Sequence, residues 1–173
     1  NQMFFEDNPF ETVKGRDDLN GLQKIRLLLT LNLSNAERNQ INMQAVPILK
    51  DPHILAAAVA ENRRVLTPLW LELLEEGKRD GSIKTEYIKE LSELLPLINF
   101  WLMPSVFPAT EEELYHKYHF VKEALAHMGL PLYDDDTTSF TEKFITDITE
   151  TSCGHTSMPE NAGKNKEKEG NQL

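Results

Sequence analysis

The chain has 173 residues, a length that fits one ordinary domain, and its 40% hydrophobic and 27% charged residues are typical of globular proteins. Its 28 Asp and Glu outweigh 18 Lys and Arg, giving a formal net charge of −10 that argues against direct binding of nucleic acid. A single cysteine, Cys153, excludes internal disulfides and multi-cysteine metal sites, and we expect a cytoplasmic protein without a cofactor.

Helical spacing of apolar residues predicts the first elements. Residues 8–11, Asn-Pro-Phe-Glu, combine an N-cap, a proline at the first helical position and a capping carboxylate. A helix over residues 19–33 follows, with one apolar face. The Ser34 and Glu37 pair is a capping-box pattern that predicts a third helix, with Pro47 near its end.

The longest helical segment is predicted to start at Asp51 and to carry a buried seam with one polar member, Asn62. Pro68 lies inside this run and is expected to kink or split it, because proline lacks a backbone donor and crowds the preceding turn. Gly81 can adopt the left-handed conformation that ends a helix.

Thr85 is expected to cap the next helix. That helix is apolar over much of its circumference, so it must be covered on more than one side. Its apolar stretch, residues 94–107, is broken by prolines and is shorter than the ~20 residues of a membrane span, so no membrane contact is expected. Thr110 and Glu113 form a further capping box. Gly129 is expected to end the helix that follows, with Leu130 placed to touch Leu125 in a Schellman-type stop.

The C-terminal part is predicted to hold a short amphipathic helix within residues 134–150, capped by Ser139. We expect the acidic run at residues 134–136 to be a solvated linker that favours the start of this helix. Residues 151–173 contain few large apolar side chains and are predicted to form a flexible tail.

Signals for catalysis and metal binding are weak. Glu113 and His116 have the i, i+3 spacing of a di-iron helix, but such a site needs the Glu-x-x-His pair twice and the chain has it once. Cys153 lies in the expected tail, where no scaffold lowers its pKa, so we interpret it as an inert thiol. The sequence therefore predicts no metal site and no enzyme activity.

Two asparagines interrupt helices that should be largely buried, Asn62 and Asn99. The preferred interpretation is an amide that bonds to neighbouring backbone or water, and the alternative is a polar group in a small-molecule pocket. Aromatic residues gather near Pro68 and Pro96, whose kinks can open a gap between helices. The candidate ligand-binding residues are Trp70, Asn99, Phe100, Met103 and Asn62.

The helices predicted over residues 87–107 and 110–128 carry apolar stripes broader than one packing partner requires. A monomer would leave such a surface in water, so we expect two copies to form a four-helix bundle through them. The candidate interface residues are Leu91, Leu95, Ile98, Leu114, Tyr118, Val121, Leu125 and Met128, some of which must also face the chain's own core.

Residues 73–83, Leu-Leu-Glu-Glu-Gly-Lys-Arg-Asp-Gly-Ser-Ile, resemble a junction in the regulatory domain of tetracycline-repressor (TetR) family transcription regulators. The resemblance covers roughly residues 10–132. It implies an all-α bundle of five or six helices, a homodimer and a small apolar or amphipathic effector. The family's N-terminal helix-turn-helix has no counterpart here, so DNA would be reached only through a missing head. Residues 1–17 would then be its connector, and residues 18–133 the effector-binding and dimerisation domain.

Two other functions remain open. A stand-alone helical adaptor would present a groove to protein partners and would respond to no small molecule. A helical-bundle enzyme of the ferritin-like kind would need metal ligands that this chain does not supply.

Overall fold

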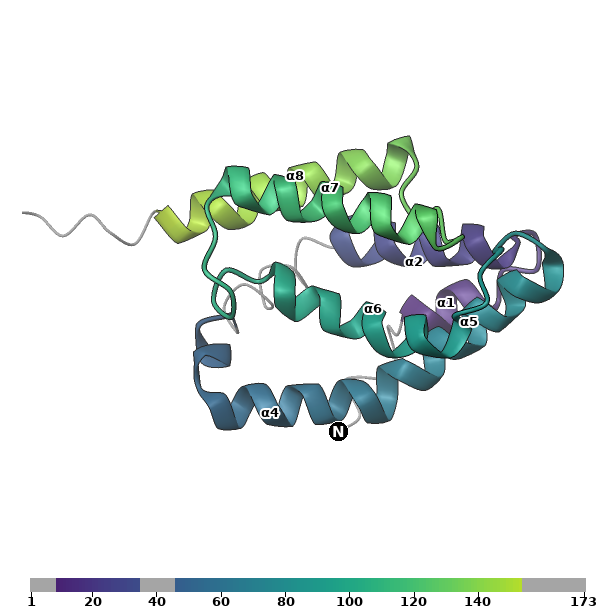
Figure 1. Ribbon diagram of the computed structural model, residues 1–173, viewed down its shortest axis with the longest axis horizontal. Helices are drawn as coiled ribbons and strands as arrows, with labels where there is room; N and C mark the ends of the chain where they lie inside the picture. Colours follow the sequence, from purple (N-terminus) through teal and green to yellow (C-terminus); the bar gives the residue numbers. More distant parts are fainter. Residues whose placement is uncertain (1–8, 35–45, 154–173) are drawn as a thin grey trace, which may run out of the picture.

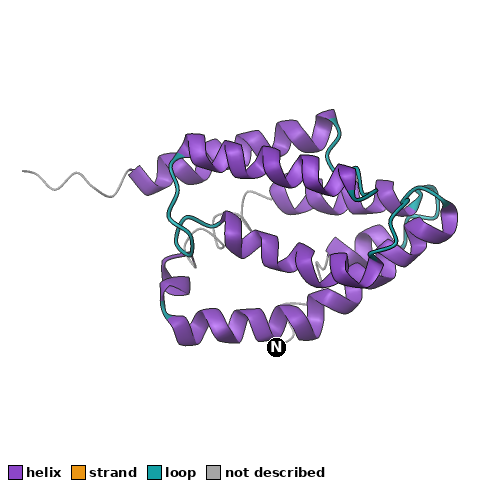
Figure 2. Cartoon of the chain, viewed as in Figure 1, coloured by secondary structure: helices purple, strands orange, loops and turns teal. Residues whose placement is uncertain are grey.

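The computed structural model describes residues 9–34 and 46–153, and every regular element in these two ranges is a helix (Figure 2). This confirms the predicted all-α bundle. No helix in the described part is long and apolar enough to cross a membrane. The elements in chain order are α1 (Pro9–Lys14), α2 (Gly21–Ser34), the 3-10 helix η1 (Val46–Lys50), α4 (Pro52–Glu61), the π-helix η2 (Asn62–Leu66), α5 (Thr67–Asp80), α6 (Ile88–Leu102), α7 (Glu111–His127) and α8 (Asp135–Cys153).

The helices form a bundle in which α7 and α8 lie side by side along one edge and α4 lies at the opposite edge (Figure 1). Helices α2, α5 and α6 lie between these edges, and α1 packs against α2. The main core draws buried side chains from α1, α2, α5, α6, α7 and the turn after α7, among them Val13, Ile25, Leu28, Leu73, Leu74, Leu91, Leu125 and Leu130. By contrast, α4 contributes no buried residue, although it is strongly apolar.

Most predicted helix ends are confirmed. The Asp51 carboxylate caps α4, and Thr110 and Glu113 form both bonds of the capping box at the start of α7. Gly81 and Gly129 have φ values of 81° and 85°, the left-handed conformation that favours glycine. After α7 the Leu130 N–H donates to the Leu125 carbonyl at 2.9 Å, which completes the predicted Schellman-type stop.

Pro68 splits the long helical run, as its chemistry predicts. The turn before it, Asn62–Leu66, is a π-helix, in which the Thr67 N–H bonds to the Asn62 carbonyl five residues earlier. Helix α5 begins at Thr67 with Pro68 in its first turn. The segment is therefore two α-helices, α4 and α5, joined through η2.

Some predicted boundaries differ from the observed ones. Helix α8 begins at Asp135, because the Asp134 carboxylate accepts the Thr137 N–H at 3.0 Å and the acidic run enters the first turn. Thr85 does not cap α6 directly; its hydroxyl accepts the N–H of Tyr87, and α6 begins at Ile88. The helix predicted after Ser34 falls largely on residues 35–45, outside the described residues, and so do most of the predicted tail and the first eight residues of the connector.

The glycine-containing junction after α5 has a structural role at the start of α2. Gly21 and Gly77 lie where α2 crosses α5, so closely that a Cβ on Gly21 would lie less than 3.0 Å from the Gly77 backbone. The Asp80 carboxylate accepts the Gly21 N–H at 2.6 Å, and the Ser82 hydroxyl accepts the Leu22 N–H at 3.1 Å. The last residue of α5 and the loop after it therefore satisfy two of the four free amides at the N-terminus of α2.

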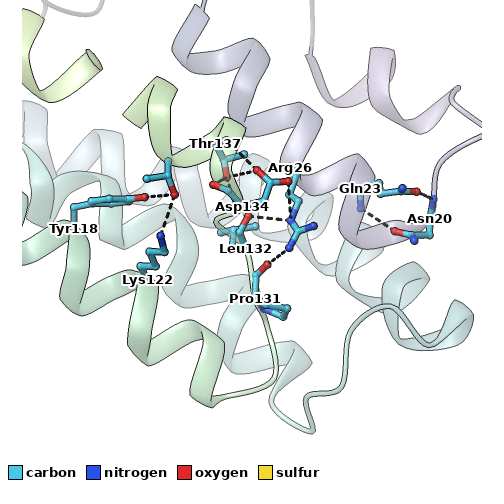
Figure 3. A network of polar contacts seen from close by, with 10 residues as sticks. Asn20, Gln23, Arg26, Tyr118, Lys122, Pro131, Leu132, Asp134 and Thr137 are labelled. Carbon is cyan, nitrogen blue, oxygen red and sulfur yellow. Dashed lines mark hydrogen bonds and ion pairs between the residues drawn. The ribbon is translucent and has the colours of Figure 1, made fainter. Parts of the chain in front are cut away.

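A polar network joins α2 to the start of α8 (Figure 3). Arg26 of α2 donates to the carbonyls of Pro131 and Leu132 and lies 3.5 Å from the Asp134 carboxylate. Burial tends to raise the pKa of Asp134, but hydrogen bonds from Thr137 and the charge of Arg26 lower it below the ordinary value. These contacts fix the chain segment between α7 and α8, and with it the position of α8 on α2.

Candidate functional site

The candidate site is an apolar face that the antiparallel helices α6 and α7 leave open to solvent. On α6 the inner face carries Leu91 and Leu95, which are buried, whereas Leu94 and Leu97 point outward with 42% and 44% of their surface exposed. Phe120 of α7 is 64% exposed, the highest fraction among the large apolar side chains of the described residues. Scattered exposed apolar residues are ordinary, but a contiguous group marks a site of interaction.

These exposed residues line one groove between the two helices. The groove has a volume of about 270 Å³, and each of its lining side chains is apolar. The lining residues are Leu94, Leu97, Ile98 and Trp101 from α6, with Phe120, Val121 and Ala124 from α7. A groove of this composition can accept apolar side chains from a second helix.

One end of the groove is held by aromatic and cationic contacts. Trp101 and Phe120 meet edge to face with ring centroids 5.9 Å apart. The Lys117 ammonium donates to the Trp101 carbonyl at 3.2 Å and lies 5.2 Å from the Trp101 ring centroid and 5.6 Å from that of Phe107. A cation at the last carbonyls of α6 complements the helix dipole, so Lys117 fixes Trp101 in the groove wall.

Most of the candidate interface residues do not line the groove. Six of the eight are buried in the chain's own core, and Ile98 and Met128 are partly buried. The six buried residues are Leu91, Leu95, Leu114, Tyr118, Val121 and Leu125. Of the eight, only Ile98 and Val121 line the groove, so a second copy would meet mainly other residues of these two helices.

Sequence reasoning missed Phe120, which carries the most exposed part of the face. The stripe predicted for α7 follows its buried side, and Phe120 lies off that stripe between His119 and Val121. A large aromatic residue outside the buried stripe of an amphipathic helix was the available signal, because the chain's own core does not cover that side of the helix.

The candidate ligand-binding residues have unlike environments. Trp70 is 6% exposed and packs edge to face on Phe10 with ring centroids 5.6 Å apart. Asn62 is half-buried in the π-helical turn, Phe100 and Met103 are half-buried, and Asn99 is exposed to solvent. The cavity that these residues were predicted to line stays a prediction, with Trp70 in the main core and Asn99 at the surface.

A second, wide and open hollow lies along α7. It is lined by Glu111, Glu112, Tyr115, His116 and His119 and has a volume of about 630 Å³. Within residues 9–34 and 46–153, however, no three His, Cys, Asp or Glu side chains are grouped so that they could hold a metal ion. Cys153, expected in a tail, is the last residue of α8.

Comparison with known proteins adds no relative to this description. No family model, curated protein or solved structure matches the chain. Function is therefore inferred from the geometry of the described residues, above all from the open face of α6 and α7.

Proposed function

We propose that the chain is the small-molecule-sensing and dimerisation part of a transcriptional regulator of the tetracycline-repressor type, a non-enzymatic cytoplasmic protein. The observation that carries this proposal is the apolar α6–α7 face, which a second copy of the chain would cover. Such a face is required of a protein that places two identical DNA-binding heads at a fixed spacing. The heads would precede α1 in a longer protein.

A two-fold axis beside Phe120 suits the charges of α7. It would set the α7 helices of two copies antiparallel, each Phe120 beside the groove of the other copy. Lys117 and Glu123 are equally far from Phe120 along the helix, so each would lie at the level of the other in the partner copy. Glu113 and His127 are matched in the same way. In this pairing no charged residue of one α7 lies opposite a residue of like charge on the α7 of the other copy, which favours this arrangement of the two helices.

Sensing would then act as a population shift. An effector that binds one arrangement of the helices more tightly than another changes the fraction of dimers whose heads fit their DNA sites. Because the chain alone has a net charge of −10, we expect it to show no salt-sensitive DNA binding. A gel shift at low salt checks this, and submicromolar binding to duplex DNA would contradict the proposal.

The dimer face is tested by a charge at its centre. Phe120→Glu would bury an unpaired carboxylate between the two copies. We therefore expect the dissociation constant of the dimer, measured by sedimentation equilibrium, to rise by on the order of 100-fold. Phe140→Glu is the matched control, because Phe140 is an exposed phenylalanine of α8 outside the groove. Equal effects of the two substitutions would contradict the proposed face.

An adaptor that binds another protein is the second candidate, because the same groove could receive a foreign amphipathic helix. The two functions differ in their response to small molecules. A sensor should gain thermal stability from some apolar or amphipathic compounds, by about 2.7 kcal/mol at a concentration 100 times the dissociation constant. A monomeric chain that no compound of such a panel stabilises would favour the adaptor.

A further inference from the structure

One lysine near the N-terminus of α2 is buried where α1, α2 and α5 meet. Lys24 is only 4% exposed, and its ammonium donates to the Glu76 carboxylate of α5 at 2.7 Å. The same ammonium donates to the main-chain carbonyl of Lys14, the last residue of α1, at 3.2 Å. A single charge thus bonds α2 to α5 and to the end of α1.

Helix α1 depends on such contacts, because a helix of six residues does not persist alone in water. Phe10 lies edge-on to Trp70, and Val13 is completely buried. The Lys14 side chain pairs with Glu72 of α5 at 2.7 Å. Glu72 and Glu76 are one turn apart on α5, so α1 is held along consecutive turns of that helix.

The contacts that hold α1 differ from those that hold α2 on α5. The latter include the close crossing of Gly21 and Gly77 and the bond from the Gly21 N–H to the Asp80 carboxylate. These do not involve α1 and would survive its release. Lys24 is the group that belongs to both sets, because its charge is shared between Glu76 and the carbonyl of Lys14.

We propose that the buried Lys24–Glu76 pair is a latch for α1: with the pair intact α1 is docked on α5, and with the pair open α1 is released while α2, α5 and α6 stay packed. Without the ammonium, the Lys14 carbonyl loses a charge-assisted donor at the point where the chain turns from α1 into α2. If the proposed function holds, α1 leads to the DNA-binding head, and a movement of α5 that strains the latch would reach the head through α1. The latch itself does not require that function.

The test removes the latch charge in a chain where Trp70 is the sole tryptophan. Trp101→Phe provides this background, since the sequence has two tryptophans. Lys24→Met keeps the apolar stem and removes the charge, and Glu76→Gln weakens the same bond more mildly. Arg16→Met is the matched control, because it removes one positive charge beside α1 whose exposed partner, Asp18, does not belong to α5.

Two readouts report the docking of α1. The amides of Gly15 and Arg16 donate to carbonyls of α1, Glu11 and Val13, so their hydrogen exchange follows that helix. Acrylamide quenching of Trp70 reports whether Phe10 still covers its ring. For Lys24→Met we expect these two amides to exchange roughly tenfold to a hundredfold faster and the quenching to rise, with the amides of α5 and α6 unchanged. Glu76→Gln should give a smaller change of the same kind, and Arg16→Met should leave the exchange of the Gly15 amide and the quenching of Trp70 unchanged.

Two results would overturn the latch. One is unchanged exchange at Gly15 and Arg16 in both latch variants. The other is an equal loss of protection across all helices in Glu76→Gln, which would make the pair a general stability element. Should Lys24→Met fail to fold, Glu76→Gln alone decides between these outcomes. Neither readout depends on dimerisation or on DNA. The latch can therefore fail while the proposed function stands, and the proposed function can fail while the latch stands.

Discussion

The crossing of α2 and α5 allows a sharp prediction about one glycine. In Gly21→Ala the new Cβ would lie less than 3.0 Å from the backbone nitrogen and Cα of Gly77. A backbone cannot turn aside as a flexible side chain can, so the two helices must separate. Separation also lengthens the bond from the Gly21 N–H to the Asp80 carboxylate, which is 2.6 Å long in the native chain.

The magnitude follows from two opposed contributions. Overpacking a well-packed contact costs about 1–3 kcal/mol, and the backbone clash places this site at the upper end. Replacing glycine by alanine in a helix returns up to about 1 kcal/mol, less at the first position. We therefore expect a net loss of about 2 kcal/mol, which moves the urea midpoint down by roughly 1 M for a slope of about 2 kcal/mol/M.

Two other glycines serve as controls in the same urea titration. A Cβ on Gly15 would meet nothing closer than 3.8 Å, so Gly15→Ala should leave the midpoint almost unchanged. A Cβ on Gly81 has open space around it but a φ of 81°, so Gly81→Ala should cost about 1–2 kcal/mol through backbone strain alone. If Gly21→Ala is as stable as Gly15→Ala, the close helix crossing is refuted.

Three further predictions concern caps and charges. Thr110→Ala removes one bond of the capping box and should lower the free energy of unfolding by about 1 kcal/mol in urea titration, whereas no change would contradict the cap at α7. Burial tends to raise the pKa of Asp80, but hydrogen bonds from Ser82 and Gly21 lower it below 3.8, so the Asp80 carboxylate stabilises the fold above that pH and this stabilisation is lost as the pH falls through the native pKa. Asp80→Asn should therefore flatten the acid limb of the curve of unfolding free energy against pH, and an unaltered limb would argue against this role. Arg26→Met removes two bonds to the segment before α8 and should speed amide exchange in α8 more than in α6, and equal changes would refute the link.

The sequence predicts the helices of this fold well because their ends depend on local chemistry. Asp51, Thr110, Gly81 and Gly129 act within a few residues of their own position, and each is found in its predicted role. The start of α8 was placed too late because the Asp134 cap depends on Thr137, and Ser139 offers an equally good pattern nearby.

The candidate site was harder to predict, because a stripe of apolar residues does not say which neighbour covers it. Leu91 and Tyr118 were among the candidates for an interface with a second copy, some of which were expected to face the chain's own core. The structure buries both, Leu91 in the main core and Tyr118 against α8. The 19-residue length of α8 was not predicted, and it fills the side of α7 that carries Tyr118. Lys24 was also missed, since its burial depends on Glu76, 52 positions away in the sequence.

Sedimentation equilibrium of the unmodified chain at tens of micromolar shows whether two copies associate, as the proposed α6–α7 interface requires. The open apolar face predicts a species of twice the 19.8 kDa chain mass, which dissociates on dilution. A species of 19.8 kDa throughout that concentration range would contradict the proposed interface, and with it the proposed regulator.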